Sequence, residues 1–117
     1  MLLAEAIPGK RSMALCAAAR QHGLVVAAGL TERDGDAVFN AALLIDADGR
    51  ITLHHRKIAE LDFARAVYAT GTTLGVADTA IGRVGLAICA DYWAPALGLA
   101  QGAMGADILL SPSAWAV

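Results

Sequence analysis

Cysteine, charge and aromatic side chains are all scarce in this chain of 117 residues. Its only cysteines are Cys16 and Cys89, and without CxxC spacing they indicate neither a disulfide scaffold nor a zinc site. Charged residues make up 17% and the net charge is -2, which gives no basic field for nucleic acid or for anionic lipid. No apolar run approaches the length of a membrane span, and residues 1–9 lack the positive start of a secretory signal. We therefore expect a cytoplasmic protein with no nucleic-acid and no membrane partner.

Apolar residues, in contrast, are abundant. They make up 57% of the chain, above the usual share of about 45–50%. The length suits one small domain, yet a chain of this composition covers itself poorly with polar side chains. We expect it to be part of a larger α/β unit, or a subunit that buries one face against a partner.

Hydrophobic periodicity and turn residues predict an α/β fold. Ser12 is the expected N-cap of a helix that Gly23 ends, and Pro95 fits the first turn of a second helix at 94–104. Thr31 to Asp36 reads as a polar turn, and residues 58–70 as loop with one helical turn. The expected strands are 24–30, 37–46, 50–57, 74–79, 83–89 and 106–110. Hairpin strands followed by a β-α-β unit indicate a mixed sheet with helices on one face.

Cys89 ends the apolar run of a strand buried on both faces. Ligands of open α/β sheets bind beyond the carboxyl ends of the strands, and a following helix N-terminus stabilises a thiolate there. Cys89 is therefore a candidate nucleophile. The alternative is that Cys89 packs as a small hydrophobe, as free cysteines commonly do.

Lys57 is one of two lysines, and it stands where a strand ends. A lysine close to a cysteine at strand ends holds a thiolate by charge and stabilises a tetrahedral oxyanion. Lys10, the other lysine, is expected in a polar loop. The alternative for Lys57 is an exposed residue at a strand end.

Several segments, taken together and in order, resemble the middle of the nitrilase, or carbon–nitrogen hydrolase, superfamily. They are Val-Phe-Asn-Ala-Ala at 38–42, Asp-Gly-Arg at 48–50, His-Arg-Lys-Ile at 55–58, Tyr-Ala-Thr-Gly at 68–71, Ile-Gly-Arg-Val-Gly-Leu-Ala-Ile-Cys-Ala-Asp at 81–91, and Gly-Ala-Asp-Ile-Leu-Leu-Ser-Pro-Ser-Ala-Trp at 105–115. The resemblance implies a partial α-β-β-α sandwich and a Glu-Lys-Cys triad that cleaves non-peptide carbon–nitrogen bonds of small amides or nitriles, without metal or cofactor.

Carried onto this sequence, the resemblance implies that Cys89 attacks the substrate carbon and forms a thioester. Lys57 and the N–H of Ala90 would stabilise the oxyanion, and a glutamate would act as general base. In the family the helix after the cysteine packs at a dimer interface, so we expect a homo-oligomer through the 94–104 helix.

The glutamates of the family pattern are missing. The first would precede this chain, and the second would fall near Phe63 or Ala64. We expect Glu60 and Asp62 to be solvated rather than to stand in. The chain then resembles a truncated carbon–nitrogen hydrolase domain over 1–117 with little or no turnover. The alternative is a catalytically silent binding or assembly module.

The residues around Cys89 suggest further roles. Ala90 and Asp91 follow the cysteine where nitrile-active members carry Trp-Glu, which resembles the amidase and carbamoylase branches instead. Asp91 is expected to fix the turn by bonding backbone N–H groups, with a catalytic role as the alternative. Trp93 is a candidate for the substrate entrance or for aromatic core. Ser111 and Ser113 are candidate substrate contacts, and Ser113 also reads as a turn residue.

Overall fold

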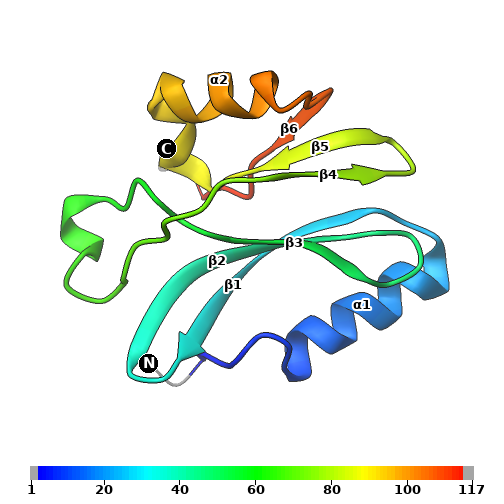
Figure 1. Cartoon of the computed structure of the whole chain (residues 1–117). Coiled ribbons are helices and arrows are strands. Elements are labelled where there is room, and N and C mark those ends of the chain that lie inside the picture. Colours follow the sequence, from blue (N-terminus) through cyan, green and yellow to red (C-terminus); the bar gives the residue numbers. More distant parts are fainter. Residues whose placement is uncertain (1–2, 115–117) are drawn as a thin grey trace.

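Two three-stranded sheets pack face to face in the computed structural model, which describes residues 3–114, and a helix lies on the outer side of each sheet (Figure 1). The first sheet is antiparallel, in the order β1-β2-β3, and the second, β4-β5-β6, has β4 antiparallel and β6 parallel to β5. The elements are α1 (Lys10–His22), β1 (Val26–Asp34), β2 (Ala37–Ile45), β3 (Ile51–Arg56), η1 (Asp62–Ala64), β4 (Val76–Thr79), β5 (Gly82–Leu86), η2 (Cys89–Trp93), α2 (Pro95–Ala103) and β6 (Ile108–Leu110).

Strand β2 is buried on both of its faces, and its alternating side chains build two cores. Ala42 and Leu44 point toward the second sheet and pack with Val84, Leu86 and Ile88. On the other face, apolar side chains of β2 pack beneath α1 in a cluster of Ala19, Leu43 and Ile45. Such double burial explains the near-continuous apolar sequence of this strand.

The α/β class and the α-β-β-α order of layers are confirmed. The predicted mixed sheet is the second one, with α2 on one face, whereas the hairpin strands form a separate antiparallel sheet. The chain between 57 and 75 crosses from one sheet to the other, and β3 and β4 do not share a sheet. Among residues 3–114, neither helix has the length and apolar character needed to cross a membrane.

Three predicted boundaries are wrong. Helix α1 begins at Lys10 with Gly9 as its N-cap, and Ser12 is instead its third residue, whose Oγ accepts the N–H of Gly9 at 2.7 Å. The polar residues 31–34 continue β1, because they pair with residues 37–40 of β2 across a turn of only two residues. Strand β5 ends at Leu86, and Cys89 already belongs to η2.

The loop that follows β3 is held close to Lys57. The N–H of Lys57 donates to the Asn40 carbonyl and the N–H of Gly71 donates to the Lys57 carbonyl, each at 2.8 Å. A Cβ at Gly71 would lie 2.0 Å from the carbonyl oxygen of Arg56, so only glycine allows this approach. The backbone on both sides of Lys57 is therefore fixed.

Candidate active site

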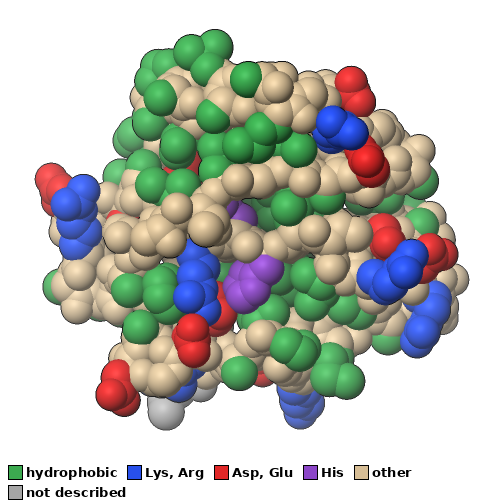
Figure 2. All heavy atoms as spheres, viewed as in Figure 1, with side chains coloured by type: hydrophobic (Ala, Val, Ile, Leu, Met, Phe, Trp, Pro, Cys, Tyr) green, Lys and Arg blue, Asp and Glu red, His purple; other side chains and the backbone are tan. Residues whose placement is uncertain are grey.

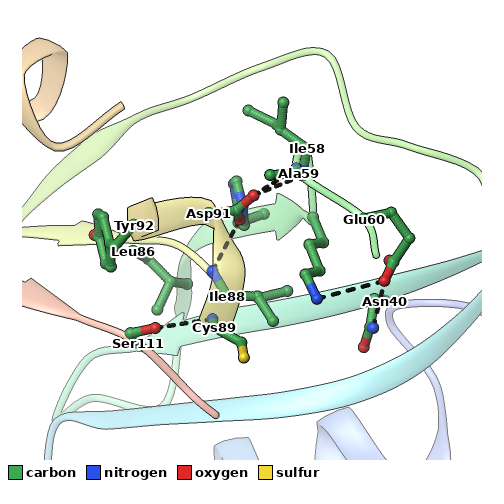
Figure 3. A network of polar contacts seen from close by, with 12 residues as sticks. Asn40, Ile58, Ala59, Glu60, Leu86, Ile88, Cys89, Asp91, Tyr92 and Ser111 are labelled. Carbon is green, nitrogen blue, oxygen red and sulfur yellow. Dashed lines mark hydrogen bonds and ion pairs between the residues drawn. The ribbon is translucent and has the colours of Figure 1, made fainter. Parts of the chain in front are cut away.

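Cys89 stands at a sharp turn between β5 and η2. Its φ of 46° is the only positive φ outside glycine among residues 3–114. An L-residue in this left-handed region costs about 1–2 kcal/mol, so the surrounding contacts must hold it there. The Cys89 N–H donates to Ser111 Oγ at 2.9 Å (Figure 3). Because β6 runs parallel to β5, Ser111 emerges at the same end of the sheet as the cysteine.

Alternation along β3 sends neighbouring basic residues to opposite faces. Arg56 pairs with Ala41 and lies on the outer face, where its guanidinium bonds Glu32 at 2.9 and 2.6 Å. Burial raises the pKa of Glu32, but the contacts with Arg56 and His54 together outweigh this effect, so the pKa is lowered. Lys57, on the inner face, is directed toward the second sheet.

Lys57 forms a buried ion pair with Glu60. Lys57 Nζ lies 3.4 Å from Glu60 Oε1, and their side chains are 5% and 1% exposed. Asn40 Nδ2 donates to the other carboxylate oxygen of Glu60 at 3.4 Å (Figure 3). The prediction of a solvated Glu60 is wrong, because the loop after β3 turns the residue back toward Lys57. Asp62 is fully exposed, as predicted.

One pocket of about 430 Å³ collects the reactive side chains. Lys57 and Glu60 come from the loop that follows β3 of the first sheet, and Cys89 comes from η2, which follows β5 of the second sheet. The remaining wall is largely apolar and includes Ile88 and Leu61. A thiol, an ammonium and a carboxylate thus share one cavity. Within 3–114, no cluster of three or more His, Cys, Asp or Glu side chains has the arrangement of a metal site.

Asp91 makes the backbone bonds that its position predicted. It is fully buried, and it accepts the N–H groups of Ile88, Ile58 and Ala59 at 2.9, 3.0 and 2.7 Å. His55 Nε2 is a fourth partner at 2.7 Å. Burial raises the pKa of Asp91, but the His55 contact and the backbone N–H groups outweigh it, so the pKa is lowered. Asp91 is an ionised carboxylate in the interior.

The other candidate residues differ in whether they line the pocket. Ser113 lines it, while Ser111 supports the Cys89 N–H and contacts Ser113 Oγ at 3.2 Å. Ala90 is buried, and Trp93 is 63% exposed and does not line the pocket. Their contacts with a substrate stay predictions. Trp115 lies outside the described residues.

Sequence reasoning missed Glu60, Asn40 and His55. A signal existed for Asn40 and His55, because both lie in segments that carry the family resemblance. For Glu60 the spacing of three residues after Lys57 differs from the family pattern. Only the path of the loop reveals its position.

Comparison with known proteins identifies the family. The carbon-nitrogen hydrolase family model matches residues 1–117, and the chain belongs to this family. The chain is 37% identical over 106 residues to Nitrilase 3 of an unknown prokaryotic organism, covering 89% of this chain and 31% of that protein. It is also 37% identical over 101 residues to a citrullinase of Francisella tularensis subsp. tularensis, covering 82% and 35%.

Solved structures agree in fold. A carbon-nitrogen hydrolase from Helicobacter pylori superposes with a TM-score of 0.86 at 28% identity, covering 92% of this chain and 38% of that one. The chain therefore spans about a third of the length of the curated relatives it matches.

Proposed function

We propose that this chain carries the nucleophilic centre for hydrolysis of a non-peptide carbon–nitrogen bond. The observation that supports this proposal is the common pocket of Cys89, Lys57 and Glu60. The Cys89 thiol is the nucleophile, and the Lys57 ammonium and the Ala90 N–H stabilise the oxyanion. Glu60, buried beside Lys57, exchanges protons with the thiol, the leaving nitrogen and water.

The reaction proceeds in two steps. The Cys89 thiol passes its proton to Glu60, and its sulfur attacks the carbonyl carbon to give a tetrahedral oxyanion. Collapse of this intermediate breaks the C–N bond, and Glu60 returns the proton to the departing nitrogen, leaving a thioester on Cys89. A water molecule then gives a proton to Glu60 and attacks the thioester carbon. Collapse of the second tetrahedral intermediate breaks the C–S bond and releases a carboxylic acid, and Glu60 returns its proton to the sulfur, which restores the thiol.

An amide or carbamoyl substrate suits the site better than a nitrile. The support is the Ala90-Asp91 pair after the cysteine, where nitrile-active members of the family carry Trp-Glu. The pocket of about 430 Å³ has room for a small molecule, and its apolar wall suits a short aliphatic acyl group.

Turnover by this chain is expected to be weak. The first family glutamate has no counterpart in the sequence, and a positioned general base contributes about 10²–10⁴ in rate. Glu60 supplies part of that role. If Glu60 does not act as a general base at all, the alternative is that the chain is a catalytically inactive binding or assembly module.

Intact-protein mass spectrometry and an ammonia assay test the proposal. Short aliphatic amides, a ureido compound and the matching nitriles are incubated with the wild-type chain and with Cys89→Ala. We expect slow ammonia release, or an acyl adduct on Cys89, with the amides, and neither in the variant. A faster reaction with nitriles would contradict the amide preference. No adduct and no ammonia with any compound would favour the silent module.

Iodoacetamide labelling tests the lysine separately from turnover. Labelling of Cys89 is expected to be about tenfold slower at pH 7 in Lys57→Ala, because the ammonium no longer stabilises the thiolate. Cys16, read out by peptide mass spectrometry in the same sample, is the internal control. An unchanged rate at Cys89 would argue against a lysine-assisted thiol.

We also propose that α2 mediates self-association. Hydrophobic side chains gather over α2 at the top of the molecule (Figure 2). Leu99 and Met104 on and beside the helix are 73% and 42% exposed. An exposed apolar patch of this kind commonly marks an interface. Light scattering should detect a dimer that Leu99→Lys weakens; a monomer at all concentrations would contradict this proposal.

A further inference from the structure

The carboxylate of Asp91 makes four hydrogen bonds, two at each oxygen. Oδ1 accepts the N–H groups of Ile58 at 3.0 Å and Ala59 at 2.7 Å. Oδ2 accepts the N–H of Ile88 at 2.9 Å and contacts His55 Nε2 at 2.7 Å. An ionised carboxylate can only accept, so His55 donates from Nε2.

The carboxylate as a whole joins two parts of the fold. Oδ1 holds the loop between Lys57 and Glu60, which belongs to the first sheet. Oδ2 accepts from Ile88, which lies between β5 of the second sheet and Cys89, and it also contacts His55 of β3 in the first sheet. No strand pairing joins the two sheets among residues 3–114. In Figure 3, Asp91 lies between the Ile58–Ala59 backbone and the Ile88 backbone.

An ordinary helix cap does not account for this arrangement. As a cap of η2, Asp91 would need only the bond from Ile88 N–H. The two bonds from the loop after Lys57 and the bond from His55 of β3 lie outside that role. A surface carboxylate would cap η2 equally well, whereas Asp91 is completely buried.

We propose that Asp91 is a positioning residue that fixes the Lys57–Glu60 loop and the Cys89 turn relative to each other, so that the ammonium stands beside the thiol. This inference rests on the proposed roles of Lys57 and Cys89. Asp91 is not among the residues that line the pocket, and it acts through the two backbone segments that carry the reactive side chains.

Two variants of Asp91 separate the effect of the position of its carboxylate from the effect of its charge. Asp91→Asn keeps the shape, but its NH₂ group cannot accept, so two of the four donors face a donor. Asp91→Glu keeps the charge and moves the carboxylate by one methylene. The matched control is Asp62→Asn, which removes a fully exposed carboxylate from the same loop. Lys57→Ala reports whether the lysine assists the thiol at all.

The measurement is the pH profile of iodoacetamide labelling at Cys89, with Cys16 read out in the same sample. We expect Asp91→Asn and Asp91→Glu to raise the midpoint pH of Cys89 labelling by about one pH unit. At pH 7 this corresponds to about tenfold slower labelling. Cys16 and the Asp62→Asn control are expected to be unchanged. The direction is informative, because loss of a negative charge alone would move the profile downward.

Each other outcome overturns the inference. A profile that stays in place or moves downward in both variants, while Lys57→Ala moves it upward, removes the positioning role and leaves the proposed function intact. No effect from Lys57→Ala removes the proposed function as well. If both Asp91 variants are unfolded, so that Cys16 is labelled as fast as in the urea-denatured wild-type chain, Asp91 contributes only to stability. If one variant unfolds, the folded one decides.

Discussion

Lys57 Nζ and Glu60 Oε1 lie 3.4 Å apart with both side chains almost completely buried. Removing two charges from water costs several kcal/mol, and their mutual attraction often does no more than offset that cost. Stability alone therefore gives little reason to keep this pair inside the fold. Its place in the wall of the Cys89 pocket gives a chemical reason.

Glu60→Gln is expected to separate reactivity from turnover. Without the carboxylate the Lys57 charge is no longer neutralised, so iodoacetamide labelling of Cys89 at pH 7 should become faster. Ammonia release from amides should fall by about 10²-fold, because the proton acceptor is lost. The free energy of unfolding should also fall, by about 3 kcal/mol, since a buried lysine loses its partner.

Asp62→Asn is the control for this change. Its side chain is fully exposed, so we expect a change in unfolding free energy within about 0.5 kcal/mol and no change in labelling. Equal behaviour of the Glu60 and Asp62 variants would contradict a special role for Glu60.

Two glycine substitutions should act in opposite directions. In Gly71→Ala the new Cβ would meet the Arg56 carbonyl oxygen, so we expect a loss of about 3 kcal/mol in unfolding free energy. Gly102→Ala adds a Cβ to α2 where no atom lies within 4 Å apart from the neighbouring residues and the backbone of the helix itself, and should stabilise the chain by about 0.5–1 kcal/mol. Urea denaturation of both variants measures this contrast. Comparable losses in the two would show that the approach of Gly71 to Arg56 is not tight.

Acid should destabilise the fold partly through Asp91. The contacts of its carboxylate lower its pKa in the folded state below the ordinary value of 3.8. A lowered folded pKa adds stability above the unfolded pKa, and this stability is lost as the pH falls through the folded value. Urea midpoints measured between pH 6 and pH 2 should fall less steeply in Asp91→Asn than in the wild-type chain, if the variant folds. Parallel curves would contradict the lowered pKa.

Alkali should destabilise the fold through Tyr92. Burial raises the pKa of Tyr92 to about 12, and its hydroxyl donates to Gln101 Oε1 at 2.7 Å. A raised folded pKa gives stability that is complete below the unfolded value, near 10, and is lost as the pH rises toward 12. Absorbance at 295 nm should show a tyrosine titrating near pH 12, and this step should be absent in Tyr92→Phe. Titration of Tyr92 near the ordinary tyrosine value of about 10 would be the contrary result.

Local patterns allowed the α/β class, most of the elements and the position of Lys57 at the end of a strand to be predicted. The order of the layers was predicted from the family resemblance instead, and Cys89, expected as the last residue of its strand, lies three residues beyond the end of β5. The apolar run before Cys89 and the break after Lys57 are visible without any tertiary information. Residues 31–34 were misassigned because their polarity resembles a turn, while their pairing with β2 is a tertiary effect.

The position of Glu60 could not be predicted for a related reason. A charged residue in a short loop is usually solvated, and the burial of this one depends on Lys57 and Asn40, which come from two different strands. Likewise, the turn chemistry of Asp91 was foreseeable, but its bonds to the loop after β3 cross between sheets and leave no periodic trace in the sequence.

The left-handed backbone of Cys89 lowers the stability of the fold, while its thiol supplies the proposed nucleophile. Glycine would relieve the conformational cost at this turn, so selection for robustness alone would favour replacing the residue that carries the thiol. We expect selection to keep cysteine at this position, despite its conformational cost, only while the thiol has a function. Relatives that have abandoned catalysis should therefore drift toward glycine at this site before they lose their core.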